Sequence, residues 1–394
     1  MPDFRLYLTG AAFSRIGDNM ESVTRSWLVW ELTGSPFWLG FMVFCHWIPN
    51  TTLSLFAGVL ADRVDNRKLI LFSESLYLIS ALGIGILTLA GVIQVWEIAV
   101  LLVVHGMASA ISNPSRQVFV HDMVGRDRLM SAVSLNNSLF QTMQFVGPAL
   151  AGTLIASVGV GTAYMINTTA FVPAMITLAL IRVAKQHRQT GQVSALSSTV
   201  EGFRHVRDNR VLLSLLALTT LPALFIGESI SAMMPIFATQ VLGVGAQGMG
   251  FLLSANGLGA IVAAVFISYL GSLRHKGALI VAASLAYALL LIVFSGSTWY
   301  LLSLIMLVGI GAASVTSGTL INTSLQLAAS DRLRGRVMGL HSLGTLGVRS
   351  FNGPLIGSFA SAIGAPLAVA VLGGIVAVGI LAIAVLSPEG RRLD

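Results

Sequence analysis

The chain has 394 residues, of which 55% are hydrophobic and only 10% are charged, with a mean hydropathy of +0.84. Soluble proteins carry about 25% charged residues, so this composition excludes a water-soluble globule and predicts a protein that crosses the membrane many times. The net charge of +7 comes from basic residues in short loops, which excludes nucleic acid as a partner. Cys45 is the single cysteine, so neither an internal disulfide nor a paired Cys/His metal framework is expected.

Charged and Gly/Pro-rich breaks divide the sequence into apolar stretches, each long enough to cross about 30 Å of hydrocarbon as a helix. The first stretch contains Asp18, Glu21 and Arg25 and runs on without a small-residue cleavage site. We therefore expect it to stay in the mature protein and not to act as a signal peptide. In total the stretches predict twelve transmembrane helices, over residues 4–32, 36–60, 69–90, 95–119, 130–158, 162–182, 211–241, 246–271, 277–296, 299–327, 336–363 and 366–387.

The basic residues give an independent test of these spans. All but four of the 23 Lys and Arg residues lie near the termini or in alternate loops, and the intervening loops hold none. Because basic residues accumulate on the cytoplasmic side of a membrane, both termini are expected to be cytoplasmic. The four exceptions lie inside predicted helices and are Arg15, Arg25, Arg116 and Arg349.

The longest polar stretch, residues 183–210, lies halfway along the chain and is predicted to be a cytoplasmic linker with a surface helix. The sequences on its two sides repeat each other: Gly17-Asp18 reappears 210 positions later as Gly227-Glu228. This repeat predicts two parallel six-helix bundles, over residues 1–182 and 211–394. Chance matching between Gly-rich apolar strings is the alternative.

Three short motifs carry a resemblance to a known family. GVLADRVDNRK, from Gly58 to Lys68, lies in the tight turn after the second helix, NPSRQ closes the fourth helix, and VGPALAG, from Val146 to Gly152, lies in the fifth. Across essentially the whole chain the sequence resembles the major facilitator superfamily, and more narrowly its twelve-helix drug and siderophore exporters. The resemblance implies an all-α fold of two pseudo-symmetric six-helix bundles, a location in the bacterial cytoplasmic (inner) membrane, and no cofactor.

The same resemblance implies two gates. VGPALAG would form an outer-gate seam at Gly147, Pro148 and Gly152, because Pro148 frees a backbone carbonyl and small residues permit close helix contact; plain packing is the alternative. The fourth helix contains the stretch LLVVHGMASA, whose single glycine is Gly106. It lacks the arginine that proton-coupled members often carry before this glycine. Glu74 and Arg116 are expected to pair between helices. The inner-gate candidates are Gly58, Asp62, Arg63, Arg67, Arg116 and Asp122.

Acidic side chains inside the membrane are candidate proton carriers. A charge at the bilayer centre costs about 2.5 to 3.5 kcal/mol, so we expect it to face a polar cavity or a partner. Asp18 lies about 18 Å along the first helix, Glu21 and Arg25 follow on the same face, and Glu228 occupies the equivalent place in the second repeat. Asp18, Glu228 and Glu21 are predicted to load and release protons. The alternative is that these acids only pair with Arg25 and Arg349.

Polar and aromatic residues on several helices are candidates for a central substrate cavity. Embedded arginines favour an anionic cargo such as a siderophore, because guanidinium groups hold carboxylates through charge-assisted hydrogen bonds. Helix packing is the alternative role for each candidate. His46, His105 and His341 lie singly on three helices, so no metal site is predicted. The cavity candidates are Arg25, Arg349, Asn352, Asn136, Gln141, Gln144, Asn256, Asn322, Trp30 and Phe225.

The sequence contains no phosphate-binding loop and no soluble segment long enough for a nucleotide-hydrolysing domain, which leaves the proton gradient as the energy source. We expect a secondary active transporter that exports a small amphipathic molecule, a siderophore or a drug, by alternating access in exchange for protons. The alternatives are proton-coupled or facilitated uptake of a small solute, a non-transporting membrane sensor and, most remotely, a membrane-embedded enzyme. The expected partners are the cargo, anionic if the arginines bind it, protons and the lipid bilayer, and we expect a monomer.

Overall fold

The computed structural model describes residues 2–181, 203, 206–207, 209–227, 229–270, 275–330 and 333–386, and every regular element in them is a helix. Contacts divide the chain into two compact units. The first contains Met1–Thr190 and Met234–Ser254, and the second contains Gly191–Met233 and Ala255–Asp394. Most of the predicted linker lies outside the described residues, and the predicted bundle boundaries at residues 182 and 211 stay predictions.

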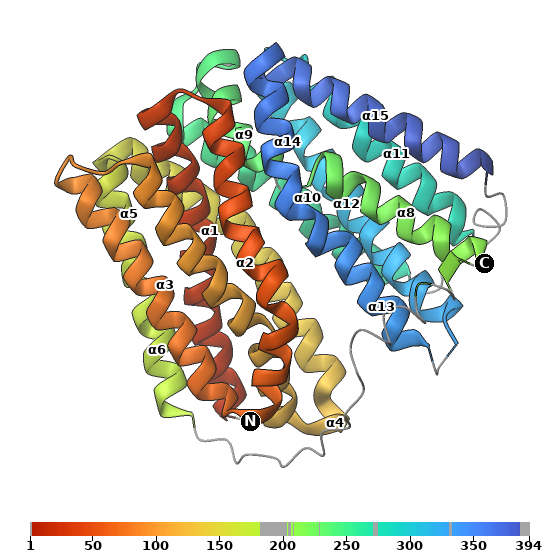
Figure 1. Ribbon diagram of the computed structural model, residues 1–394, viewed down its shortest axis with the longest axis horizontal. Helices are drawn as coiled ribbons and strands as arrows, with labels where there is room; N and C mark the ends of the chain where they lie inside the picture. Colours follow the sequence, from red (N-terminus) through yellow and green to blue (C-terminus); the bar gives the residue numbers. More distant parts are fainter. Residues whose placement is uncertain are drawn as a thin grey trace. The chain divides into compact units, whose positions relative to one another are not determined.

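The first unit begins with helices that run alongside one another as a bundle (Figure 1). Polar side chains at predicted loop positions start these helices: Asp65 accepts a hydrogen bond of 3.0 Å from the backbone N–H of Arg67, and Gln94 forms a capping box with Glu97. The helices are α1 (Pro2–Thr33), α2 (Pro36–Arg63), α3 (Asn66–Leu89), α4 (Val95–Val158), α5 (Val160–Thr169) and α6 (Phe171–Leu180).

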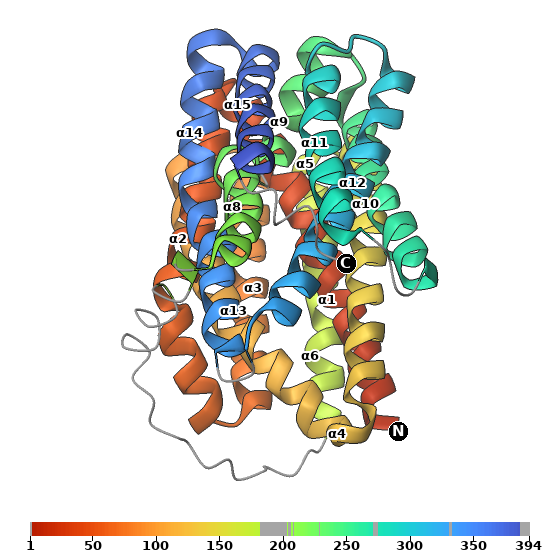
Figure 2. The same cartoon turned by 90° about the vertical axis from the view of Figure 1, so that its right-hand side faces the viewer.

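Two glycines interrupt the long helical run of the first unit. Gly125 has φ 69° and ψ 179° inside α4, so this element consists of two helices joined by a sharp turn, which Figure 2 shows at the lower end of the molecule. Gly159, with φ 80°, separates α4 from α5. Glycine takes these left-handed angles without the steric cost of a Cβ atom. The two parts of α4 therefore correspond to the fourth and fifth predicted spans.

The rest of the chain is also helical. Asn209 starts α8 by accepting hydrogen bonds of 3.0 and 3.2 Å from the N–H groups of Val211 and Leu212. In the second unit, α15 packs against α8, α11 and α14, as Figure 1 shows in green and blue. The elements are α8 (Arg210–Phe225), α9 (Ser229–Ile236), the π-helix η1 (Phe237–Val241), α10 (Gly245–Leu270), α11 (Lys276–Ser295), α12 (Tyr300–Ala328), α13 (Arg334–Ser342), the π-helix η2 (Leu343–Gly347), α14 (Val348–Ile363) and α15 (Ala365–Leu386).

Among the residues that the structure describes, most positions of each of the twelve predicted spans are helical. Within the described residues, nine helices are long and apolar enough to cross a membrane by length and composition. The helix α1 is not among them, and it carries Arg15, Asp18, Glu21 and Arg25 within eleven positions. The protein is thus an all-helical, multi-pass membrane protein, whereas the count of twelve stays a prediction.

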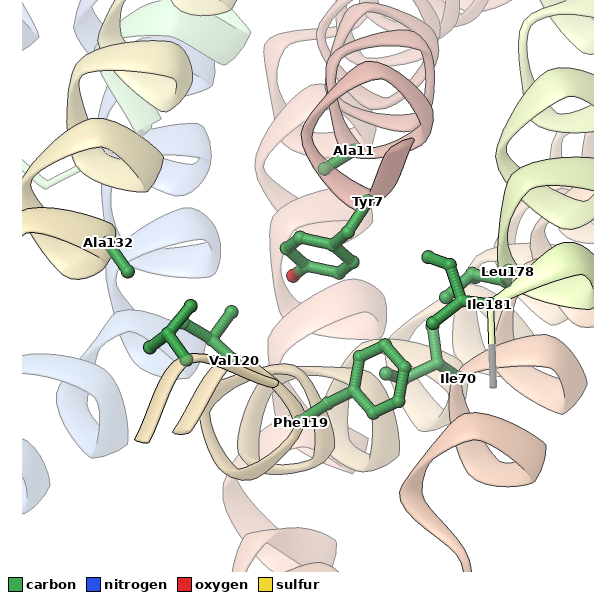
Figure 3. Close-up of a cluster of buried hydrophobic side chains, with 9 residues drawn as sticks. Tyr7, Ala11, Ile70, Phe119, Val120, Ala132, Leu178 and Ile181 are labelled. Atoms are coloured by element: carbon green, nitrogen blue, oxygen red, sulfur yellow. The ribbon is translucent and has the colours of Figure 1, made fainter. Parts of the chain in front are cut away.

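An apolar cluster joins four helices of the first unit (Figure 3). The rings of Tyr7 from α1 and Phe119 from α4 meet edge to face, with centroids 5.8 Å apart. Ile70 from α3 and Leu178 from α6 are buried in the same cluster. This packing fixes the positions of α1, α3 and α4, the helices on which the charged side chains of the candidate site lie.

Candidate functional site

Glu21 is the centre of a group of charged and titratable side chains inside the first unit. Its side chain is only 1% exposed, and both carboxylate oxygens face nitrogen atoms. Arg25, one turn further along α1, places Nη1 3.3 Å from Oε1, as the i to i+4 spacing predicts. His105 of α4 places Nδ1 3.2 Å from Oε2. Glu21 therefore lies between a permanent cation and a titratable base.

His105 lies where several helices meet. Its ring centroid is 5.3 Å from that of His46 on α2 and 4.4 Å from that of Tyr77 on α3. A Cβ atom at Gly106 would overlap the carbonyl oxygen of His46, so a glycine is needed for this close approach of α4 to α2. Sequence spacing does not predict these contacts, because the two histidines are on separate helices. Within the described residues, no group of three or more His, Cys, Asp or Glu is arranged to hold a metal ion.

A second buried ion pair joins α4 to α3. Nη2 of Arg116 contacts Oε1 of Glu74, whose side chain is fully buried. Ser14 of α1 donates a hydrogen bond of 3.0 Å to the same carboxylate and accepts one of 3.1 Å from Arg116. Nε of Arg116 also donates to Ser112, at 2.9 Å. The expected pairing of Glu74 with Arg116 is thus present, and it is an internal contact of one unit.

Asp18 lies between the two ion pairs. It is half-buried, and its Oδ1 atom is buried with no hydrogen-bond partner among the described residues. It interacts electrostatically with His105, Arg15 and Arg116, and with Glu21. A buried carboxylate oxygen without a donor is costly, since the group has lost its water and gained no replacement. Asp18 is therefore the acid of this group that a proton would neutralise with least loss of existing contacts.

Arg15 is a site residue that sequence reasoning noted only as an embedded charge. Its guanidinium carbon lies 5.1 Å from the ring centroid of Phe140 on the second part of α4, a cation–π contact. Within the described residues no carboxylate lies at ion-pair distance from Arg15, whereas Arg25 and Arg116 each have one. The signal in the sequence is its place one turn before Asp18, on the same face of α1.

The predicted outer-gate seam is a line of close backbone contacts. A Cβ atom at Gly147 would lie 2.6 Å from Cβ of Asn19 on α1. One at Gly152 would lie 2.6 Å from the carbonyl oxygen of Ala246, and one at Gly250 2.5 Å from that of Pro148. The second part of α4 therefore touches α1 and the beginning of α10 with no room for side chains, within the first unit.

The inner-gate candidates have separate surroundings. The Nε atom of Arg67 donates to the carbonyl of Leu178 at 2.7 Å, and Nη2 donates to that of Ala179, so Arg67 caps α6. Gly58 faces open space, and the side chain of Arg63 is exposed. Oδ1 of Asp122 lies 3.6 Å from Nδ1 of the neighbouring His121. The side chain of Asp62 lies outside the part that the structure describes.

Most of the cavity candidates are half-buried. In the first unit, Nε1 of Trp30 donates to the hydroxyl of Thr239 in η1, at 3.1 Å. In the second unit, Asn322 accepts a hydrogen bond of 2.6 Å from Gln326. The half-buried candidates are Asn136, Gln141, Gln144, Trp30, Arg25, Asn256, Asn322, Phe225 and Arg349.

The second unit holds Asn352 and Arg349. Asn352 is 1% exposed, and its Nδ2 atom donates a hydrogen bond of 2.9 Å to the carbonyl of Leu224. Leu224 lies just before the end of α8, where Gly227 takes φ 39°. Asn352 thus holds α14 against the end of α8. Arg349 is the second residue of α14, which follows η2, and it interacts electrostatically with Tyr287 of α11. Glu228 lies outside the described residues.

Residues 2–393 match the family described as transmembrane secretion effectors. The chain is 24% identical to the multidrug efflux pump Tap of Mycolicibacterium fortuitum, over 99% of this chain and 96% of the pump. It is 25% identical to the enterobactin exporter of Citrobacter koseri, over 92% of this chain and 83% of the exporter. It is 23% identical to the staphyloferrin A transporter of Staphylococcus aureus over 64% of this chain, and spans about 63% of that transporter's length.

Solved structures share the fold. A nucleoside transporter superposes with a TM-score of 0.78 at 10% identity, over 98% of this chain and 99% of that chain. A transporter of the POT family in complex with 5-aminolevulinic acid gives a TM-score of 0.76 at 10% identity, over 98% of this chain and 96% of that chain. The chain therefore belongs to the transmembrane secretion effector family of the major facilitator superfamily, and the relatives that it matches are named as transporters, exporters and an efflux pump, not as enzymes.

Proposed function

We propose that the protein is a secondary active exporter of a small amphipathic molecule, a siderophore or a drug, which it moves by alternating access in exchange for protons. The observation that carries the proposal is the state of Asp18: a carboxylate about halfway along α1, half-buried, with one buried oxygen that has no hydrogen-bond partner among the described residues. The names of the relatives, a multidrug efflux pump and an enterobactin exporter, support the choice of cargo.

Asp18 suits a proton carrier better than the other acids of the first unit. Glu21 and Glu74 each have a guanidinium partner, and a proton on either carboxyl would break an existing ion pair in a dry environment. A proton on Asp18 breaks no ion pair among the described residues, and its Oδ1 atom has no hydrogen bond to lose. We assign the equivalent role in the second half to Glu228, on the evidence of the sequence repeat alone.

Exchange requires that the proton and the cargo do not occupy the site together. One proton driven inward across the membrane supplies about 2.3 kcal/mol for each 100 mV, enough to raise a cargo gradient about fifty-fold per proton at that potential. We further propose a monomer in the bacterial cytoplasmic membrane, with both termini cytoplasmic. In this scheme the glycine seam of α4 closes the outer side, and the turn after α2 closes the inner side.

The test uses everted membrane vesicles, in which respiration pumps protons into the lumen and makes it acidic. Ethidium serves as the drug probe and enterobactin as the siderophore probe. We expect energised vesicles with the wild-type protein to accumulate at least one probe, and vesicles with Asp18→Asn to lose at least about nine-tenths of that accumulation at equal protein levels. Glu97→Gln is the matched control, because Glu97 lies in the capping box at the start of α4, away from the charged group.

Two results would overturn the proposal. Undiminished, proton-dependent accumulation by Asp18→Asn would remove the proton role of this residue. Probe movement out of energised everted vesicles would indicate uptake into the cell in place of export, which is the alternative direction.

A further inference from the structure

We propose that the first unit holds a small cluster of bound water between α1, α4 and α5, at a site formed by Glu21, His105, Tyr164 and Asn167. We call these four residues the water site. None of them is more than 6% exposed. Each has at least one buried polar atom without a hydrogen-bond partner among the described residues: Oε2 of Glu21, Nδ1 of His105, Oη of Tyr164, and both Oδ1 and Nδ2 of Asn167.

Asn167 is the clearest case, because its whole side-chain amide is affected. The residue is fully buried, and neither its donor nor its acceptor atom bonds to a described residue. A polar group that loses water on burial and gains no hydrogen bond opposes folding, and most such groups in proteins are paired with protein atoms or with ordered water. Several of them in one bundle would together oppose folding by an amount comparable with the net stability of a domain.

The packing of α1 against α5 and α6 fixes the register of these helices. Residues 160–180 form one helix of membrane length. A Cβ atom at Gly10 would overlap Thr177, and one at Gly17 would lie 3.1 Å from the ring of Phe171. Residue numbers therefore rise along α1 while they fall along the facing helix, so the two helices run antiparallel.

This register places Asn167 opposite Glu21. Glu21 lies one turn after Gly17 on the same face of α1, and Asn167 lies one turn before Phe171 on the same face of its helix. Because Gly17 faces Phe171, the next turn brings the carboxylate and the amide face to face. The two groups nevertheless make no hydrogen bond to each other, which is the arrangement that a bridging water satisfies.

His105 and Tyr164 complete the site from two further directions. Nδ1 of His105 lies 3.2 Å from Oε2 of Glu21, yet the two atoms are not aligned for a hydrogen bond. Tyr164 lies one turn before Asn167 on the same face of α5, and it interacts electrostatically with Glu21. A water molecule among these groups has the polar partners that buried water requires, about two to four.

The chemistry of the site favours water over a metal cation. Nη1 of Arg25 lies 3.3 Å from Oε1 of Glu21, so the charge of this carboxylate is already balanced and a second cation would be repelled by the first. Nδ2 of Asn167 can only donate a hydrogen bond, which a cation cannot accept. Water both donates and accepts, so it serves Nδ2 as well as the unpartnered oxygen atoms.

The test is X-ray hydroxyl-radical footprinting of the full-length protein in lipid nanodiscs, read by mass spectrometry. X-ray pulses convert bound water to hydroxyl radicals, which oxidise the side chains beside it even where bulk solvent does not reach. We expect Tyr164 and His105 to be oxidised several-fold faster than Phe119, which is 3% exposed in the apolar cluster. Oxidation of Tyr164 and His105 no faster than that of Phe119 would overturn the proposal.

Tyr164→Phe removes one hydroxyl from the site with little change in shape. We expect the oxidation rate of His105 to fall several-fold in this variant, because the water beside it loses a partner. Tyr7→Phe is the matched control, since Tyr7 is equally buried but belongs to the apolar cluster, and it should leave the rate of His105 unchanged. Equal rates of His105 oxidation in wild type and Tyr164→Phe would contradict the water site.

Asn167→Leu tests the sign of the effect on stability. If the amide were dry, an apolar residue of similar volume would remove an unpartnered polar group and stabilise the protein. If the amide binds water, the same change removes two partners of that water and leaves Glu21 and Tyr164 worse satisfied. We expect the SDS concentration at the midpoint of unfolding to fall, and a rise would overturn the proposal. If Asn167→Leu does not fold, the footprinting of Tyr164→Phe alone decides the question.

Footprinting in sodium chloride and in choline chloride distinguishes water from a bound ion. We expect the same rate for Tyr164 in both salts. Slower oxidation in sodium chloride would indicate a sodium ion at the site and overturn the assignment to water. None of these measurements needs cargo or a proton gradient, so the result for Asp18→Asn in the export assay neither supports nor weakens the water site.

Discussion

Glu74→Gln should destabilise the protein strongly, because it leaves a buried guanidinium without its carboxylate. Glu74 is fully buried, Arg116 is 6% exposed, and the two are in direct contact. After the substitution, Arg116 keeps two neutral partners, the hydroxyls of Ser14 and Ser112. These hydroxyls stabilise a guanidinium less than an ionised carboxylate does.

The magnitude follows from the surroundings of the pair. Removing one partner of a buried ion pair costs about 3 to 5 kcal/mol. Asp18 lies within electrostatic range of Arg116 and replaces part of the lost compensation, so we expect a loss near the lower limit, about 3 kcal/mol. Replacing both residues, as in Glu74→Leu with Arg116→Met, should recover most of this loss, because neither charge is then left alone.

The assay is reversible unfolding by SDS in mixed micelles, with the free energy of unfolding compared between variants at pH 7. Glu97→Gln is the control, since glutamine can keep the capping contact at the start of α4. A loss below about 1 kcal/mol for Glu74→Gln, or a double variant no more stable than the single one, would refute the reasoning.

The remaining predictions concern packing and capping. Gly152→Ala should lower the free energy of unfolding by about 1 to 3 kcal/mol, because its Cβ would lie 2.6 Å from the carbonyl oxygen of Ala246. Gly374→Ala is the control: its Cβ would meet no atom within 4 Å, so the free energy of unfolding should stay the same or rise in the same assay. Arg67→Gln should speed amide hydrogen exchange at the end of α6, since Arg67 bonds the carbonyls of Leu178 and Ala179. Equal exchange in Arg67→Gln and in the exposed Lys68→Gln would contradict this cap.

Features that depend on local spacing could be read from the sequence. Apolar stretches of membrane length coincide with helices of the structure, because the bilayer demands backbone hydrogen bonds within each segment. The pair of Glu21 with Arg25 follows from i to i+4 geometry on one helix. The pairing of Glu74 with Arg116 was also expected, since both residues lie near the cytoplasmic ends of the third and fourth predicted helices. The motifs predicted the family, which the match over residues 2–393 confirms.

Contacts between helices were decided by the tertiary structure. Nothing in the spacing of His46 and His105 indicates that their rings meet, that Arg15 lies against Phe140, or that Arg67 caps α6. Asp18 and Glu21 look alike in the sequence, yet Glu21 forms an ion pair with Arg25, whereas the described residues hold no ion pair of Asp18. The physical reason is that the sequence does not specify the rotation of each helix about its own axis. Hydropathy and charge determine which segments enter the membrane. The rotation depends on packing against neighbouring helices, for example where Gly106 meets His46 and where Gly152 meets Gly250.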